Sequence, residues 1–473
     1  MLFHTPEFLV LMIITLGFYY FLPGLRLYIL ALADMAFYAA GGIGYLGLFI
    51  LISTTTYFLA QKMHGQRGKT FLWLGIVINV GNLLLFKYTF FILTNLEKVF
   101  SISLLNHYPL FQHLALPIGI SFYTFELIAY LVDVYQKKIP ASRSWLVFWV
   151  FISFFPHRVA GPIMRGKDLI PQVSNLASSD VSSTVKLGLA YLAMGLIKKL
   201  IIADYIAIAA NHFFAQGTSL NSTGAWVAAY LYTFQIYYDF SAYSEIAVGI
   251  GYLFGINLDL NFKTPYLSAN ATEFWKRWHI TLSNWIRDYL YIPLGGSWHG
   301  SSRKYINLFI AMAISGLWHG AAWTFVAWGM YHGILLIVHN IYMKWNKPEI
   351  LQRFMKTRFY HALAVLVFFH FICLGWVLFR VEGIHNAVGI IIKMLTFNPL
   401  SLDTSLTIYL IVIAILFLMH IVERWVRQNY QQLSKLWEKY CPAPLRAAVY
   451  IVIMIVLIIS IQTQQSNFIY FKF

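Results

Sequence analysis

Charged side chains are scarce in this sequence. Only 11% of the 473 residues are Asp, Glu, Lys or Arg, whereas 59% are hydrophobic and 18% are aromatic. A water-soluble chain of this length needs far more charge to cover its surface. Apolar runs long enough to cross a bilayer recur along the chain, and the alternating pattern of a membrane barrel is absent. We therefore predict an all-α polytopic membrane protein.

Cysteine is also rare, and the common motifs of soluble enzymes are missing. Cys373 and Cys441 lie in or beside apolar segments without motif spacing, so they indicate neither a disulfide framework nor a metal site. The sequence has no glycine-rich phosphate loop, no zinc-ligand spacing and no serine nucleophile elbow. Internal repeats and low-complexity segments are absent too. We expect one membrane domain over residues 1–473, without a metal.

Acidic residues are outnumbered, with 18 Asp and Glu against 34 Lys and Arg, a formal net charge of +16. In a soluble protein this charge would suggest nucleic acid. In a membrane protein, Lys and Arg gather in cytoplasmic loops, so we expect membrane lipid and no nucleic acid as a partner. The loop at residues 61–70 carries Lys62, Arg67 and Lys69 and is predicted to be cytoplasmic. Three crossings before this loop place the N-terminus outside.

The apolar runs fit about ten to twelve crossings, at about 20 residues for each. Residues 114–131 and 145–155 are expected to be broken or re-entrant, because the first contains Pro117 and Gly119 and the second is about half a crossing long. The charged stretch 423–446 is expected to be a loop. The predicted spans are residues 8–21, 27–40, 43–60, 71–93, 185–210, 225–238, 244–254, 306–318, 321–343, 362–379, 406–420 and 447–461.

Aromatic and basic side chains are concentrated at residues 272–290. Glu273 stands four residues before Arg277, a spacing that supports a helix. We predict one interfacial helix here, with His279 at the edge of its apolar stripe and facing protein. By its position alone, His279 is either a buried structural residue or a functional group. The stripe follows helical spacing and consists of Phe274, Trp278, Leu282, Trp285 and Tyr289.

His319 lies where a long apolar run is interrupted. Residues 305–340 as one straight helix would be about 54 Å long, which exceeds the bilayer core. We expect a break at residues 316–320, where small side chains allow close backbone approach. An ionisable group at membrane depth faces the protein interior and is functional by default. The other histidines of the apolar segments are interpreted as structural: His332, His339, His370 and His420.

Two further segments place polar groups in apolar surroundings. Residues 235–245 hold Asp239 and Glu245, and residues 154–165 hold an arginine on each side of a Gly-Pro turn. Each segment either lines a cavity or contains a structural ion pair, such as one between Asp239 and a membrane arginine. An enzyme, a transporter using His319 and Asp239 as a proton relay, and a membrane scaffold all remain open at this point.

Several motifs resemble those of bacterial membrane-bound O-acyltransferases, specifically the alginate O-acetyltransferase type. The resemblance covers nearly the whole chain in order, with supporting motifs at residues 155–163, 238–244, 261–266, 375–380 and 468–473. The main motifs are Phe274, Trp275, Lys276, Arg277, Trp278 and His279; Trp285, Ile286, Arg287, Asp288, Tyr289, Leu290, Tyr291, Ile292, Pro293, Leu294, Gly295 and Gly296; and Gly316, Leu317, Trp318, His319 and Gly320.

The resemblance implies a ring of helices in the bacterial inner membrane, with a central cytoplasmic funnel leading to His319. It implies that an acetyl group moves from cytoplasmic acetyl-CoA, the co-substrate, towards a polysaccharide outside. His319 would be the general base, and His279 would orient a substrate or support His319. Transfer of D-alanine to teichoic acid, which other relatives perform, is the alternative.

The resemblance also implies a partner, an extracytoplasmic acetyltransferase of the serine-hydrolase-like (SGNH) class. A polymeric sugar is too bulky to reach a base that we expect among Trp318, Trp323 and Trp328, so the polysaccharide acceptor would be served indirectly. Lys276, Arg277 and Arg287 are candidates for binding the phosphates of coenzyme A or of lipid headgroups. Further candidate substrate-binding residues are Trp275, Trp278, Trp318 and Asp239.

Overall fold

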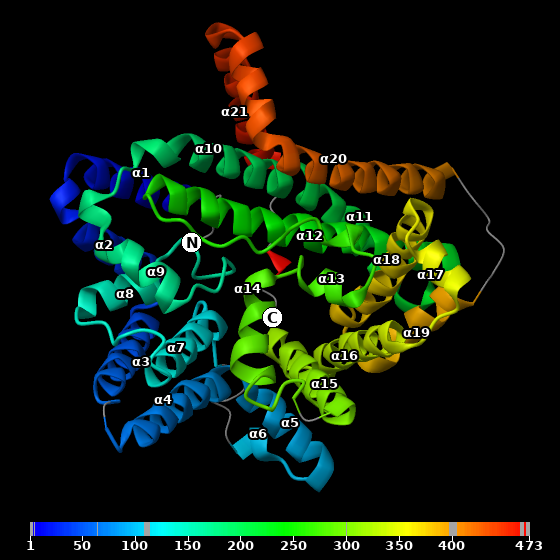
Figure 1. Ribbon diagram of the computed structural model, residues 1–473, viewed down its shortest axis with the longest axis horizontal. Helices are drawn as coiled ribbons and strands as arrows, with labels where there is room; N and C mark the ends of the chain where they lie inside the picture. The colour runs from blue at the N-terminus through cyan, green and yellow to red at the C-terminus, as the bar shows by residue number, and fades with distance from the viewer. Residues whose placement is uncertain are drawn as a thin grey trace. The chain divides into compact units, whose positions relative to one another are not determined.

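A computed structural model describes residues 3, 5–63, 65–107, 114–298, 300–396, 404–463 and 468–469. These residues form helices and connecting segments, and no strand occurs among them. The chain divides into two compact units, which we call unit 1 (Met1–Met194 and Tyr243–Leu260) and unit 2 (Gly195–Ala242 and Asn261–Phe473). The ribbon in Figure 1 follows the helices along the chain. The predicted all-α class is confirmed.

Unit 1 contains the helices of the N-terminal part of the chain. It also receives the last part of α12 (Ser222–Leu253), whose first part belongs to unit 2. Its other helices are α1 (Pro6–Phe21), η1 (Pro23–Leu25), α2 (Arg26–Ala39), α3 (Ile43–Gln61), α4 (Gly68–Leu83), η2 (Leu84–Tyr88), α5 (Thr89–Phe100), α6 (Leu104–His107), α7 (Ile120–Tyr135), α8 (Trp145–Ser153), α9 (Gly166–Ser174), η4 (Leu176–Ser178) and most of α10 (Ser182–Leu196).

Unit 2 contains the first part of α12, the three helices just before it and the helices that follow it. These helices are η5 (Ile197–Ala203), α11 (Asp204–Ala215), η6 (Gly217–Ser219), η7 (Pro265–Leu267), α13 (Ala271–Trp275), α14 (Ile280–Ile286), η8 (Arg287–Tyr291), α15 (Gly300–His319), α16 (Trp323–Lys344), α17 (Glu349–Met355), α18 (Arg358–Arg380), α19 (Ile384–Leu395), α20 (Thr404–Tyr440) and α21 (Ala443–Thr463).

Six helical segments of the described chain are long and apolar enough to cross a membrane. A seventh candidate is the pair α1 and α2, which is bent by 116° at its break. These segments confirm a polytopic membrane protein. The other predicted crossings fall on shorter or less apolar helices, so the total of ten to twelve stays a prediction. The six segments are Ile43–Gln61, Gly68–Phe100, Trp323–Lys344, Arg358–Arg380, Thr407–Gln428 and Ala443–Ser460.

Two expectations about boundaries were wrong. The spans predicted at residues 225–238 and 244–254 are parts of the single helix α12. The stretch from residue 423 was expected to be a loop, but α20 continues to Tyr440. Its charges support the helix, since Glu423 accepts hydrogen bonds from Arg427 four residues later. The helix ends just before Pro442, which cannot continue it.

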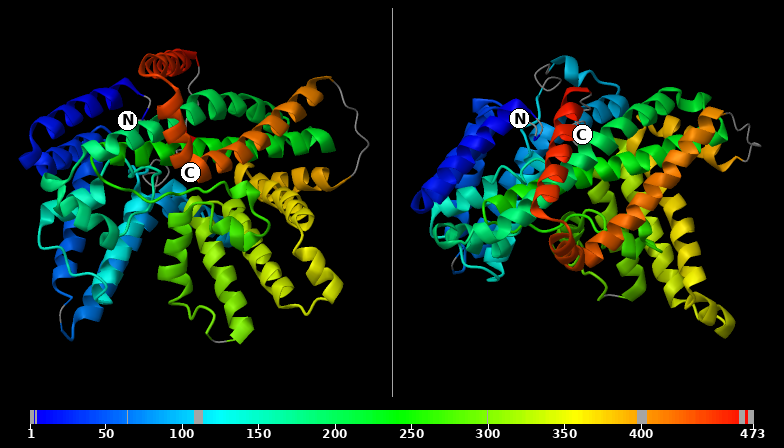
Figure 2. Two further views of the ribbon diagram at one scale, coloured as in Figure 1. Left: turned by 45° about the horizontal axis from the view of Figure 1, so that its top comes forward. Right: turned by 90° about the horizontal axis from the view of Figure 1, so that it is seen from above.

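The helical hairpin of α15 and α16 positions His319 in unit 2. The two helices lie side by side in Figures 1 and 2. Gly316 and Gly329 face each other, and a methyl group on either one would collide with a backbone carbonyl of the opposite helix. The helix α15 ends at His319, and the chain turns at Gly320 before α16 starts at Trp323. The break and the close backbone approach expected at residues 316–320 are confirmed.

Candidate active site

His279 lies in a turn between two short helices. We expected one helix over residues 272–290, and this was wrong, because α13 ends at Trp275 and α14 begins at Ile280. His279 has a φ of 42°, in the left-handed region, which interrupts an α-helix. Donors just after this turn bond to Asn261, in a neighbouring segment, instead of to a preceding helical turn. The Ile280 N–H donates to the Asn261 carbonyl at 3.0 Å, and the Thr281 hydroxyl donates to Asn261 Oδ1 at 2.6 Å.

The imidazole of His279 is enclosed by aromatic rings. Its side chain is buried, as predicted, and its ring centroid lies 4.8 Å from that of Phe240 and 6.1 Å from that of Trp318. Burial lowers the pKa of His279 to about 3, because removal from water penalises the charged form. The ring is therefore neutral at physiological pH.

His319 is the last residue of α15, and its side chain is 3% exposed. Its ring lies 5.0 Å from Trp328 and 5.3 Å from Phe379, measured between centroids. Trp328 comes from α16 and Phe379 from α18, so three helices enclose the imidazole. Trp323 was expected to enclose this histidine too. It is 54% exposed instead, because it is the first residue of α16.

The structure brings the two candidate histidines together. The ring centroids of His279 and His319 are 6.4 Å apart, although the residues are 40 positions apart in the sequence. Trp318 contacts both rings, at 6.1 Å from His279 and 5.0 Å from His319. At this spacing both imidazoles can contact one small substrate group. A neutral imidazole in such a place can accept a proton from a hydroxyl.

Tryptophans form the wall of this site. Trp278 is stacked on Phe274 at 5.8 Å and lies 4.7 Å from Trp376, which in turn lies 5.7 Å from Trp328. Trp275 is half-buried and lies 5.8 Å from Trp328. Direct analysis of the residues missed Trp376 and Phe379 as part of the site. The motif at residues 375–380, quoted only for its resemblance, was the signal that contained them.

The basic candidates of this region lie towards the surface. Lys276 is exposed. Arg277 forms the predicted ion pair with Glu273, at 2.5 Å. Arg287 is 58% exposed and pairs with Asp288 at 2.6 Å, and this hydrogen bond raises the pKa of the guanidinium. Both arginines thus have carboxylate partners in the structure, and phosphate binding by them stays a prediction.

Asp239 is buried in an ion-pair cluster of unit 2. Its carboxylate accepts a hydrogen bond from Lys199 Nζ at 2.7 Å, and Lys199 also contacts Asp204 at 2.9 Å. These contacts favour the ion-pair alternative for Asp239, with a lysine in place of the arginine considered from the sequence. The other carboxylate oxygen accepts the backbone N–H of Ile469 at 2.8 Å. Residues 470–473 of the terminal motif lie outside the described residues.

The segment at residues 154–165 forms a buried ion pair in unit 1. Arg158 donates to Glu126, and His157 Nε2 lies 3.1 Å from the same carboxylate. The Met164 N–H donates to Glu126 at 2.9 Å. Of the two alternatives for this segment, the described contacts favour structural pairing. Nowhere in the described ranges do three His, Cys, Asp or Glu side chains gather as metal ligands.

Comparison with known proteins finds several relatives of this chain. The chain is 36% identical over 407 residues to a peptidoglycan O-acetyltransferase of Helicobacter pylori, covering 79% of this chain and 74% of the relative. It is 36% identical over 434 residues to a probable alginate O-acetylase AlgI of Pseudomonas putida, covering 88% and 86%. A teichoic acid D-alanyltransferase of Bacillus subtilis is 26% identical over 285 residues, covering 57% and 70%.

A family model covers most of the chain, including both histidines. Residues 69–381 match the model of the membrane-bound O-acyltransferase family, and this range runs from the second residue of α4 to the end of α18. His279 and His319 both lie within the matched range. The resemblance noted from the sequence is confirmed. This chain belongs to the membrane-bound O-acyltransferase family and is an O-acyltransferase.

Proposed function

We propose that this enzyme takes an acetyl group from cytoplasmic acetyl-CoA and passes it across the membrane towards an extracytoplasmic polysaccharide. The observation that carries this function is the 6.4 Å separation of the His279 and His319 rings inside an aromatic site. Relatives named as a peptidoglycan O-acetyltransferase and a probable alginate O-acetylase support acetyl transfer. We further propose that the helices form a ring whose cytoplasmic funnel leads to His319.

In the proposed reaction, His319 is the general base. Its neutral imidazole accepts the proton of an acceptor hydroxyl while the hydroxyl oxygen attacks the acetyl carbonyl. The carbon–sulfur bond then breaks, and the imidazolium returns the proton to the departing sulfur, which gives the free thiol. His279 orients the thioester or the acceptor from the opposite side of the site. Much of the acceleration comes from holding the reactants in line.

Thiol release tests this role directly. The purified protein incubated with acetyl-CoA should release free thiol, and His319→Ala should reduce the rate by about 100-fold or more while the protein remains inserted and folded. A variant that keeps more than about a tenth of the activity would contradict a general-base role. Substrate movement without thiol release would instead support a transporter.

We also propose that the acetyl group reaches the polymer through an extracytoplasmic partner of the serine-hydrolase-like class. His319 is 3% exposed and surrounded by aromatic rings, which favours a small hydroxyl over a polymer as its direct acceptor. Reconstituted protein with acetyl-CoA and polymer alone should hydrolyse thioester slowly without acetylating polymer. Addition of the partner should start polymer acetylation. Efficient acetylation without it would refute the relay.

D-alanyl transfer is the second candidate. The Bacillus subtilis D-alanyltransferase supports it, but that relative is less identical and covers less of this chain than the acetylating relatives do. The proton-relay alternative is weakened, because Asp239 is paired with Lys199 and with the Ile469 backbone. Supply of a D-alanyl carrier protein in place of acetyl-CoA distinguishes the two transferase activities.

A further inference from the structure

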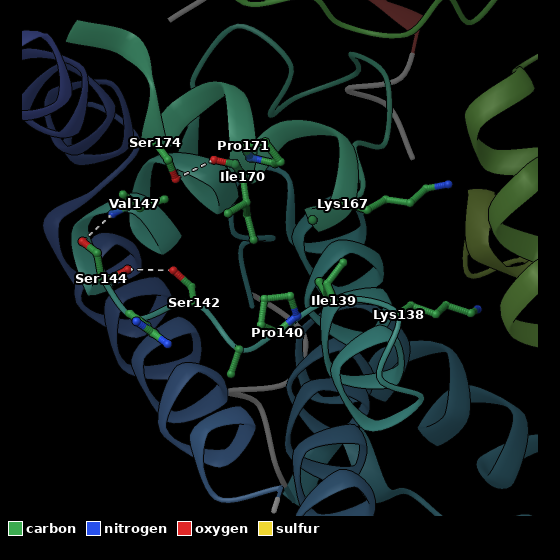
Figure 3. A pocket seen from close by; sticks show the side chains of 13 residues that line it. Lys138, Ile139, Pro140, Ser142, Ser144, Val147, Lys167, Ile170, Pro171 and Ser174 are labelled. Carbon is green, nitrogen blue, oxygen red and sulfur yellow. Dashed lines mark hydrogen bonds between the residues drawn. The ribbon is translucent and has the colours of Figure 1, made fainter. Parts of the chain in front are cut away.

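Unit 1 contains a cavity whose polar side chains do not converge on a ligand. Its volume of about 650 Å³ would admit a small molecule, and residues 138–144 and α9 form its walls. In Figure 3, the Lys138 and Lys167 side chains point away from the cavity, on the side opposite Ser142 and Ser144. Lys138 belongs to an ion pair, and the Ser144 hydroxyl caps α8. A set of polar atoms without such partners lies in unit 2.

Three aromatic rings of unit 2 form a triangle beside the candidate active site. His332 and Trp328 lie one turn apart on α16, and their ring centroids are 4.8 Å apart. Trp275 of α13 lies 5.2 Å from His332 and 5.8 Å from Trp328, again between centroids. The ring of Trp328 also lies 5.0 Å from that of His319. The triangle therefore shares one wall with the site that holds the candidate general base.

The polar atoms of these three rings have no hydrogen-bond partner among the described residues. They are Nδ1 and Nε2 of His332 and the Nε1 atoms of Trp275 and Trp328, and all four are buried. His339, further along α16, differs, since its Nδ1 lies 2.9 Å from Thr272 Oγ1. A buried polar atom that loses water without gaining a partner costs free energy, so such atoms are normally satisfied by protein, water or a ligand. Apolar packing alone could use rings without these atoms.

The neighbouring helix leaves one nitrogen of His332 without a side chain against it. Gly375 of α18 faces His332 Nε2, and a methyl group added to this glycine would lie 3.1 Å from the nitrogen. Phe274 covers the face of the imidazole, because the two rings are stacked with an interplanar angle of 11° and centroids 5.8 Å apart. The edge of the imidazole, which carries both nitrogen atoms, is therefore the part that can form hydrogen bonds.

The chemistry of the three rings determines which group they can bind. An indole N–H only donates a hydrogen bond, whereas a neutral imidazole donates through one nitrogen and accepts through the other. One ligand group that satisfies them must accept from an indole and donate to the imidazole. A hydroxyl group or a water molecule does both, whereas a carboxylate only accepts and an ammonium group only donates. The three rings are also uncharged, so a hydroxyl fits them better than an ion does.

We propose that His332, Trp275 and Trp328 bind a hydroxyl group at the edge of the candidate active site. The hydroxyl oxygen accepts a hydrogen bond from an indole N–H and donates its own hydrogen to the unprotonated nitrogen of His332. One source of this group is a water molecule of the resting enzyme, which holds Trp328 against His319. The other is a second hydroxyl of the acceptor, beside the one that reacts at His319, and this source rests on the proposed function. His332, interpreted as structural from the sequence, is then a binding residue.

Magnetic resonance of nitrogen-15-labelled indoles tests the site in the full-length protein without turnover. The N–H signals of Trp275 and Trp328, assigned by single Trp→Phe replacements, should show hydrogen bonding and magnetisation transfer to water. His332→Phe removes both imidazole nitrogen atoms, so it should shift the two signals and abolish the transfer. His332→Gln keeps a donor and an acceptor and should retain it. His339→Phe is the matched control on α16, where the histidine already has a partner, and should leave both signals unchanged.

A pair of surrogate acceptors identifies the source of the hydroxyl. If a substrate hydroxyl occupies the site, 1,3-propanediol should accelerate thiol release from acetyl-CoA roughly 3- to 10-fold more than 1-propanol does, which corresponds to one neutral hydrogen bond. His332→Phe should erase this preference, and so should Gly375→Ala, whose methyl group lies against Nε2. Equal rates with both alcohols, together with transfer from water to the indoles, assign the site to a bound water molecule.

The two measurements also separate this site from the proposed function. The indole signals need no acetyl transfer, so an inactive enzyme whose signals respond to His332→Phe would refute the proposed function and leave the site intact. Indole signals that are the same in His332→Phe and in the wild type, without a preference for the diol, would overturn the site.

Discussion

The backbone at His279 adopts the left-handed conformation, with a φ of 42°. Among residues with a side chain, Asn and His adopt this conformation more readily than Ala does. The imidazole is buried as well, so the turn and the substrate-orienting role that we propose fall on the same residue. The two roles can be separated by the choice of substitution.

His279→Asn should preserve the turn and remove the imidazole. We expect near-normal yield and thermal stability but a loss of acetyl transfer of at least about tenfold, because the substrate is no longer oriented. His279→Ala should show the same loss of transfer together with a lower yield, since Ala disfavours the left-handed backbone. Thiol release and size-exclusion profiles measure the two effects. A His279→Asn enzyme with the wild-type rate would assign His279 a purely structural role.

The buried, neutral state of His279 predicts a pH dependence of stability. The pKa of His279 is about 3 in the folded protein and about 6.5 in an unfolded chain. Between these two pH values the unfolded state binds a proton at this residue and the folded state does not. This stabilisation is complete above pH 6.5 and falls by about 1.4 kcal/mol for each pH unit below it. Thermal midpoints measured from pH 7.5 to 5.0 should therefore fall less steeply for His279→Asn. Parallel profiles would show that another group dominates.

At the scale of the element, the contact between α15 and α16 controls where His319 and Trp328 lie. The helices approach through Gly316 and Gly329, and neither position has room for a methyl group. The site therefore depends on backbone contact as much as on its own side chains. Gly316 and Gly329 are needed for their small size and not for an unusual backbone conformation, since neither has a positive φ.

Gly316→Ala should push the two helices apart. We expect destabilisation of roughly 1–3 kcal/mol from overpacking, and a loss of thiol release larger than the loss of folded protein, because His319 is displaced. Gly81→Ala is the control, since its added methyl group meets no atom within 4 Å in α4. That variant should be as stable as the wild type or more so. Equal effects of the two substitutions would contradict the packing role.

Elements with strong apolar character could be predicted from the sequence, whereas elements that depend on tertiary contacts could not. The break beside His319 could be predicted from helix length and from the small residues at positions 316–320. The turn at His279 did not, because it depends on hydrogen bonds to Asn261, which only the fold brings near. The stripe residues Phe274 and Trp278 are buried as expected, although α13 ends between them and Trp278 lies in the turn. The closeness of His279 and His319 was implied by resemblance and not by spacing.

At the scale of the whole molecule, the orientation in the membrane rests on the basic loop after α3. Lys62, Arg67 and Lys69 favour the cytoplasmic side by the distribution of positive charge. The position of the N-terminus also depends on α1 and α2. If α1 and α2 cross the membrane separately, the N-terminus lies outside. If they form one span bent by 116°, the N-terminus lies inside.

Of two reporters inserted at Gly65, only the one that is active in the cytoplasm should give a signal, because Gly65 lies in the basic loop predicted to be cytoplasmic. Paired fusions of alkaline phosphatase and green fluorescent protein read the two sides, and a second pair at Thr5 decides how often α1 and α2 cross. Phosphatase activity at Gly65 would show that the loop lies outside and that the predicted topology is inverted.

The indoles around the two imidazoles give the enzyme an optical property of its own. Trp278, Trp318, Trp328 and Trp376 are all buried within the aromatic site. Their emission depends on local polarity and on contact with quenching groups such as a protonated imidazole or a thiol. A ligand that contacts these rings, or protonation of His319, therefore changes the intrinsic fluorescence. Occupancy and protonation of the site can be followed in real time in the purified protein without a label.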